Sequence, residues 1–168
     1  MRDIRHEEPG DHDAIRRIHE QAFAPSPVEA RLVDALRDAG DLVLDLCLVA
    51  LEDGGPVGHI AFSRARLESG HDVLALAPMA VLPERQRRGT GSALVREALG
   101  RAAETDYPLV VVLGHAGYYP RFGFVPGDEH GVVDPFDAPR DAWMVHLLPH
   151  HTPRARGLVT YPEAFTLV

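Results

Sequence analysis

Lysine is absent from this chain, and all 17 of its basic residues are arginine. A P-loop nucleotide site needs a lysine directly after its second glycine, so that class of site is excluded. Only one cysteine is present, Cys47, which excludes an internal disulfide. Cys47 lies in the apolar run 44–51 with no base evident beside it. We therefore expect a buried core thiol rather than a nucleophile.

Long apolar runs are missing as well. No run approaches the roughly 20 residues that a membrane-spanning helix needs, and residues 1–8 lack the apolar core of a signal peptide. The net charge of −8 argues against general nucleic-acid binding, which requires a basic face. We expect a cytoplasmic protein without nucleic-acid or membrane partners, folded as a single domain over residues 1–168.

The hydrophobic pattern predicts an α/β fold. Helical periodicity covers residues 11–23, with Asp11 as a plausible N-cap, and residues 28–39 and 89–103. Strands are predicted at residues 2–6, 46–52, 57–67, 73–82, 108–113, 143–148 and 158–161. Short links between 46 and 82 indicate an antiparallel meander, and the continuous apolar run 108–113 indicates a strand buried on both faces. Residues 127–141 are rich in Gly, Pro and Asp and are predicted to form a loop.

The loop between the strand at 73–82 and the helix at 89–103 is the most informative stretch. Glycines let a backbone approach a ligand closely, and a helix start offers unpaired N–H groups and a positive dipole end. Arg85, Arg87 and Arg88 add a local positive field on an otherwise acidic chain. Together these features predict an anion cradle, most often for phosphate. The dinucleotide fingerprint fails, because Leu94 occupies the place of its third glycine.

Two motifs carry a resemblance to a known family. The spacing Gln86-x-x-Gly89-x-Gly91 resembles the pyrophosphate loop of the GNAT acyltransferases, which bind acetyl-coenzyme A. Tyr119 precedes the pair Gly123-Phe124 by four residues, as a tyrosine does in that family. The order of predicted elements matches too, so the resemblance covers nearly the whole chain and is closest to the YhbS-like bacterial branch. It implies the GNAT acyl-CoA N-acyltransferase fold, a mixed, mostly antiparallel sheet flanked by helices.

The resemblance also implies roles for particular residues. Pyrophosphate would be bound through the backbone of Gln86, Arg87, Arg88, Gly89, Thr90, Gly91 and Ser92. The pantetheine arm would lie along the backbone of Met79, Ala80 and Val81. Pro78 would mark a distorted strand at that opening, or else only an ordinary edge irregularity. Tyr119 would protonate the leaving thiolate, since a phenol is protonated at neutral pH; the alternative is that it only packs on the pantetheine. Tyr118 is expected to face elsewhere on a helix and to be structural.

The acceptor side is less determined. Glu29 falls where the family places substrate-facing residues, although a solvated carboxylate is the simpler interpretation. His115 follows the buried strand, where ligands gather in α/β sheets, but many family members carry asparagine near there. A water chain could replace a single general base, and mid-strand His59 is better explained as a satisfied core histidine. The loop 127–141 and the two amino-terminal helices are expected to form the acceptor pocket.

No metal is expected, because His146, His150 and His151 lack helical spacing and nearby carboxylate or cysteine ligands. The resulting hypothesis is an acetyl-CoA-dependent N-acetyltransferase that acylates a primary amine of a small molecule or a protein by direct attack. The alternatives are a non-catalytic acyl-CoA-binding module on the same fold and a transferase for longer acyl chains. The family often forms homodimers, which this sequence neither favours nor excludes.

Overall fold

The computed structural model describes residues 3–167. Its strands are β1 (Asp3–His6), β2 (Leu48–Glu52), β3 (Gly55–Leu67), β4 (Asp72–Val81), β5 (Leu109–Leu113), β6 (Val125–Pro126), β7 (Val132–Val133), β8 (Trp143–Leu147) and β9 (Gly157–Thr160). Its α-helices are α1 (His12–Ala22), α2 (Val28–Asp38), α3 (Thr90–Ala102) and α4 (Ala164–Leu167). Short 3₁₀ turns connect several of them.

The strands form one twisted sheet in the order β1-β2-β3-β4-β5-β8-β6, with β9 paired to the end of β3 and β7 paired to β9. Along the main path only β4 and β5 run parallel, and every other neighbouring pair is antiparallel. A parallel neighbour requires a crossover, and α3 supplies it between β4 and β5. The sheet is therefore mixed and mostly antiparallel.

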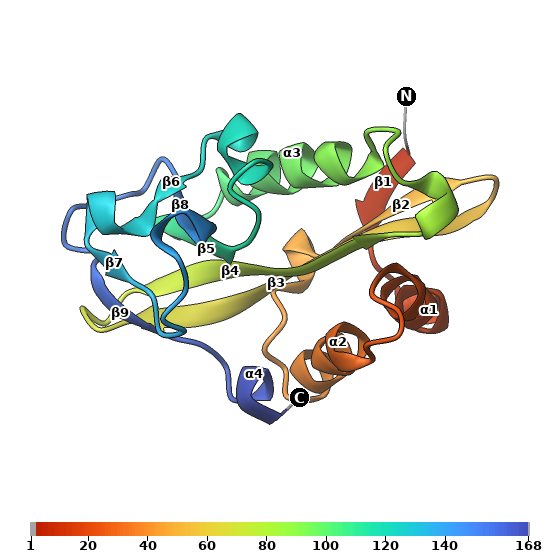
Figure 1. Cartoon of the computed structure of the whole chain (residues 1–168), viewed down its shortest axis with the longest axis horizontal. Helices are drawn as coiled ribbons and strands as arrows, with labels where there is room; N and C mark the ends of the chain where they lie inside the picture. Colours follow the sequence, from red (N-terminus) through yellow and green to blue (C-terminus); the bar gives the residue numbers. More distant parts are fainter. Residues whose placement is uncertain (1–2, 168) are drawn as a thin grey trace.

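Helices cover both faces of the sheet (Figure 1): α3 lies over one face, while α1, α2 and α4 lie on the other. Alternation along β3 explains how one strand serves both layers. Ile60 and Phe62 belong to the core cluster that contains the buried side of α3, whereas Ala61 packs with Leu32 and Leu36 of α2. The coenzyme loop predicted from the sequence joins β4 to α3, at the edge between these two layers.

Most predicted elements are present with small shifts at their ends. β2 begins at Leu48 because residues 44–46 form a 3₁₀ turn, and β3 begins already at Gly55 because Asp53 and Gly54 alone form the turn, both with positive φ. The loop 127–141 includes β7 and two 3₁₀ turns. Arg2, expected to open the first strand, lies outside the described residues.

Asp11 occupies the N-cap position of α1, as predicted. Asp11 forms no side-chain cap on α1; its carboxylate instead accepts hydrogen bonds from the backbone N–H of Glu8 (2.8 Å) and from Arg5 (2.7 Å). The acidic side chain thus stabilises the 3₁₀ turn before the helix. The sequence pattern of a helix cap does not distinguish this contact from a cap on the helix itself. Within residues 3–167, no helix combines the length and the apolarity needed to cross a bilayer.

Candidate functional site

The parallel strands β4 and β5 diverge, and this divergence creates the site. They pair at two positions, Leu74 with Val110 and Ala75 with Val111. The pairing of β3 with β4 then shifts, because Phe62 faces Leu76 whereas Ile60 faces Met79, so β4 carries one extra residue. This β-bulge at Ala77–Pro78 is the distortion predicted from Pro78, and a bulge bends a strand away from its neighbour.

Beyond the bulge, one edge of β4 remains open. Met79, Ala80 and Val81 pair on one side with Ile60, His59 and Gly58 of β3. On the other side, no β5 residue is paired with them in the described part of the chain. Because main-chain N–H and C=O groups alternate between the two edges of a strand, this stretch offers backbone groups to an extended ligand.

The loop after β4 places a helix start beside that open edge. Gly89 has φ +84°, the left-handed conformation that glycine adopts without strain, and it is the N-cap of α3. The first i→i−4 bond of the helix runs from the N–H of Ala93 to the carbonyl of Gly89, at 3.0 Å. The amides of the first turn precede that bond and point toward the loop, which is the arrangement an anion needs.

Side chains of the loop have three different roles. The Gln86 side chain donates a hydrogen bond to the carbonyl of Val81 (2.9 Å) and so ties the loop to the end of β4. Arg85 pairs with Glu52 (2.8 Å) and Asp53 (3.1 Å), so its charge is neutralised by the turn between β2 and β3. Arg87 and Arg88 are exposed at the loop surface. The local positive field therefore comes from two arginines rather than the predicted three.

Thr90 is turned inward. Its side chain is only 1% exposed and packs beside Gly58 of β3, so any contribution from Thr90 to a ligand must come from its backbone. Gly91, one residue further, lies at the opposite side of the helix start. A Cβ placed on Gly91 would be 3.3 Å from the hydroxyl oxygen of Tyr118 and 3.4 Å from Cε of Met79. A side chain at this position would therefore crowd the contact between the first turn of α3, Met79 of β4 and Tyr118.

Tyr119 begins a 3₁₀ helix, η4 (Tyr119–Phe122), that follows β5. Its ring packs so closely on Gly114 that a Cβ there would lie 2.4 Å from it, and the ring of Phe124 stands edge-on at 5.5 Å. Burial, with a smaller contribution from neighbouring Tyr118, raises the pKa of Tyr119 to about 12. The phenol is therefore protonated at any physiological pH, as a proton donor must be.

Tyr118 does not have the orientation predicted for it. The segment forms a single 3₁₀ turn rather than an α-helix, so the two tyrosines do not diverge as helix neighbours would. The Tyr118 hydroxyl lies 3.2 Å from Oγ of Ser92 in the first turn of α3. The sequence analysis missed this contact, because it derived the direction of the Tyr118 side chain from the assumption that the segment is helical.

The two acceptor-side candidates, His115 and Glu29, lie apart from the contact between Tyr118 and Ser92. His115 has an exposed side chain, and its carbonyl accepts hydrogen bonds from the N–H groups of Tyr118 (3.0 Å) and Tyr119 (3.3 Å). Its backbone therefore holds the start of η4 in place. Glu29 is half-buried at the second position of α2, on the opposite face of the sheet from α3. Within the described residues, neither of these two side chains contacts Tyr118 or Tyr119.

A cavity of about 390 Å³ opens within the predicted acceptor loop. Trp143, Val132, Asp128, Asp134, Ala138 and Arg140 are among its lining residues. Ala142 precedes Trp143, and its carbonyl accepts a hydrogen bond from Gly114 (3.0 Å), but the Trp143 and Tyr119 side chains belong to different core clusters. The lining residues of this cavity all lie between residues 128 and 143, and none of them belongs to α1 or α2.

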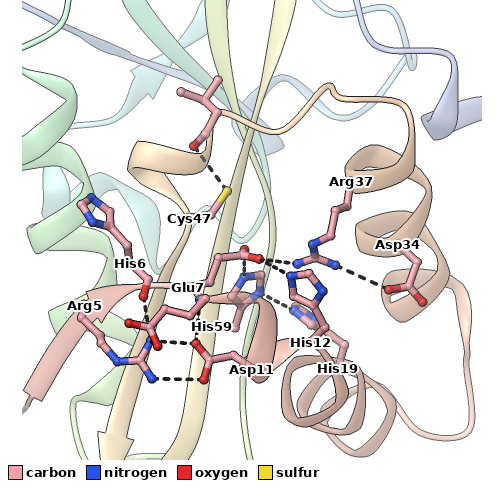
Figure 2. Close-up of polar contacts among 12 residues, drawn as sticks. Arg5, His6, Glu7, Asp11, His12, His19, Asp34, Arg37, Cys47 and His59 are labelled. Atoms are coloured by element: carbon pink, nitrogen blue, oxygen red, sulfur yellow. Dashed lines mark hydrogen bonds and ion pairs between the residues drawn. The ribbon is translucent and has the colours of Figure 1, made fainter.

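A buried polar cluster lies under β3, between the sheet and α1 (Figure 2). The Glu7 carboxylate accepts a hydrogen bond from Nε2 of His59 (3.0 Å), and Nδ1 of His59 is 2.9 Å from Nε2 of His19. Arg37 of α2 completes it with an ion pair to Glu7. His59 is therefore the satisfied sheet histidine that was predicted. Because Nε2–H of His59 donates to Glu7, a neutral His59 accepts at Nδ1 a hydrogen bond from Nε2–H of His19. Burial lowers the pKa of both rings and so keeps them neutral.

The cluster predicts a loss of stability in mild acid. Burial lowers the pKa of His19 from 6.5 to about 3 and also lowers the pKa of His59. Below pH 6.5 the unfolded chain therefore binds protons that the folded chain does not, so the free energy of unfolding falls as the pH falls. For each of these histidines, the free energy of unfolding falls by up to about 1.4 kcal/mol for each pH unit. Urea unfolding from pH 7.5 down to about 5 measures it, above the range in which Glu7 titrates.

His19→Gln removes one of the two titrating groups, so we expect the pH slope of its stability to be smaller than that of the wild type. His71→Gln, at a half-buried histidine that contacts Ser69 outside the cluster, is the matched control for the removal of a histidine. An unchanged slope in His19→Gln would show that His19 is protonated to the same extent in the folded and unfolded chains.

Cys47 lies beside the cluster as the predicted core thiol. It is fully buried, and burial raises its pKa to about 12, which leaves no thiolate for nucleophilic chemistry. Residues 3–167 contain no group of three or more His, Cys, Asp or Glu side chains placed to hold a metal ion.

Comparison with known proteins identifies the family. The model of the acetyltransferase (GNAT) domain matches residues 44–126. The chain is 39% identical to the N-acetyltransferase YjhQ of Escherichia coli over 142 residues, covering 80% of this chain and 77% of YjhQ. It is 36% identical to the N-acetyltransferase YhbS of E. coli over 166 residues, covering 96% and 97% of the two chains. Both relatives are uncharacterised.

Two solved structures are similar over almost the whole chain. The E. coli YhbS structure in complex with CoA superimposes with a TM-score of 0.90 at 34% identity, covering 98% of this chain and 92% of that one. A GNAT acetyltransferase of Brucella melitensis in complex with acetyl-CoA gives a TM-score of 0.81 at 36% identity, covering 98% of each. On this similarity in sequence and structure, the chain belongs to the GNAT family of N-acetyltransferases.

Proposed function

We propose that this protein transfers the acetyl group of acetyl-CoA to a primary amine by direct attack, without a covalent enzyme intermediate. The observation that carries the proposal is the open edge of β4 beside the uncapped start of α3. Gly91 presents no side chain between the open edge of β4 and the start of α3, and the exposed Arg87 and Arg88 lie in the loop before the helix, where phosphates would lie. Acetyl-CoA has this chemistry: an amide-bearing arm between a thioester and a pyrophosphate.

The chain's own groups can then be assigned. Backbone N–H groups between Gln86 and Ser92 bind the pyrophosphate, and the main chain of Met79–Val81 pairs with the pantetheine amides. A backbone N–H at Ala80 or Val81 stabilises the oxyanion that forms when the amine attacks. Tyr119 donates its phenolic proton to the departing thiolate, and its burial keeps that proton in place until the thiolate forms.

The acceptor amine must arrive uncharged. We assign the 390 Å³ cavity to the acceptor, since it lies within the long loop that was expected to form the acceptor pocket. Asp128 in its wall is paired with Arg140 at 2.6 Å, whereas the Asp134 carboxylate is held by the N–H groups of Phe136 and Ala138. The apolar floor at Trp143 and the Asp134 carboxylate suit an amine with an apolar body. Glu29 and His115 remain predicted acceptor-side residues, and water can carry the released proton.

Calorimetric titration with acetyl-CoA tests the proposal first, with ATP and NAD as controls. We expect binding of acetyl-CoA at one site per chain and none of the two nucleotides. A panel of amines, scored by release of free CoA thiol, then tests transfer. A chain that binds acetyl-CoA tightly but releases no thiol with any amine would favour a non-catalytic acyl-CoA-binding module. No binding at all would contradict the proposal.

A further inference from the structure

Tyr118 stands where two parts of the proposed coenzyme site meet. Its hydroxyl is 3.2 Å from Oγ of Ser92, in the first turn of α3, and it would be 3.3 Å from a Cβ on Gly91. Met79 of the open strand edge reaches the same point from the other side. A ligand that contacts both the helix start and the open edge of β4 would therefore lie close to this hydroxyl.

The ring of Tyr118 is fixed by neighbours other than Ser92. The guanidinium of Arg121 lies over it at 4.7 Å, and Nε of Arg121 donates a hydrogen bond to the Tyr118 carbonyl at 3.0 Å. The rings of Tyr119 and Phe122 each stand edge-on to it at 5.1 Å. Because these contacts hold the ring, the hydroxyl is positioned in advance, and its single bond to Ser92 is not what orients it.

The two hydroxyls can each donate and accept a hydrogen bond. The two hydroxyls lie at the start of α3, next to backbone amides that attract an anion. This arrangement suits a ligand in which a phosphate group is joined to a chain that bears hydroxyl and amide groups. We propose that Tyr118 and Ser92 together form a coenzyme-binding pair, which holds the junction between pyrophosphate and pantetheine. This inference rests on the proposed function.

The test uses the different roles of the two tyrosines, coenzyme binding for Tyr118 and proton donation for Tyr119. Tyr118→Phe keeps the ring and its packing and removes only the hydroxyl. We expect its affinity for acetyl-CoA, measured by calorimetry on the full chain, to fall about tenfold, as the loss of one good hydrogen bond does. The KM for acetyl-CoA should rise correspondingly, with kcat changed by less than about threefold.

Ser92→Ala keeps the backbone amide and removes the partner hydroxyl. Its affinity should fall by a similar factor, and the double variant should lose little more than either single variant, because the two hydroxyls act as one unit. Tyr107→Phe, at a half-buried tyrosine beyond the other end of α3, is the matched control and should bind like the wild type. Thermal unfolding of each variant checks that the fold is retained.

Wild-type affinity in Tyr118→Phe would overturn the inference, and so would a loss confined to Ser92→Ala, since Ser92 would then act alone. Fully additive losses in the double variant would also contradict it, because they would mean two independent contacts. Failure of the wild type to bind acetyl-CoA would overturn the proposed function together with this inference. Binding by the wild type with no effect of Tyr118→Phe would overturn only the inference.

Discussion

Replacing Gly91 with leucine is expected to weaken acetyl-CoA binding by at least about 100-fold, the scale of several lost contacts at once. A Cβ at this position would already be 3.3 Å from the Tyr118 hydroxyl and 3.4 Å from Cε of Met79. The remaining leucine atoms would extend into the space between β4 and the first turn of α3. The fold should persist, because leucine is a better helix former than glycine by roughly 0.8 kcal/mol.

Calorimetry with acetyl-CoA measures the loss, and chemical unfolding measures the stability of the same variant. Gly100→Leu is the matched control: Gly100 lies in the same helix, is exposed, and has no atom within 4 Å of a Cβ placed on it. It should bind acetyl-CoA like the wild type. Gly91→Ala should show a smaller loss than Gly91→Leu. Wild-type affinity in Gly91→Leu would mean that the loop is only a connection between a strand and a helix.

Local pattern was sufficient for the elements that frame this site. The change from helical to strand periodicity near residue 46 predicted the meander, and the apolar run 108–113 predicted a strand inside the sheet. Gly89 was predicted as part of a close-approach loop, and its positive φ adds a second, conformational reason for a glycine there. These features depend on neighbours within a few residues, which is the range that periodicity and turn chemistry describe.

Contacts between distant segments could not be predicted in this way. Tyr118 meets Ser92 across 26 residues of sequence, and His59 meets Glu7 across 52. No local spacing in the sequence distinguishes these residues from residues with solvated side chains. Both contacts form only when the folded sheet brings the two segments together. The neutralised charge of Arg85 has the same origin, because its partners lie on the turn between β2 and β3.

Tyr119→Phe should lower kcat by about 100-fold or more, the usual range for a lost general acid, with acetyl-CoA affinity within about twofold of the wild type. The ring contacts with Gly114 and Phe124 would be kept, so the variant isolates the proton. Because the pKa of Tyr119 is about 12, wild-type turnover should show no alkaline decline from loss of this proton up to about pH 10. Thiol release under saturating acetyl-CoA measures kcat, and Tyr118→Phe is the converse control, with weakened binding and nearly normal kcat. An unaltered kcat in Tyr119→Phe would remove Tyr119 from the acid role and leave water as the proton donor, since the ring alone would then account for the packing.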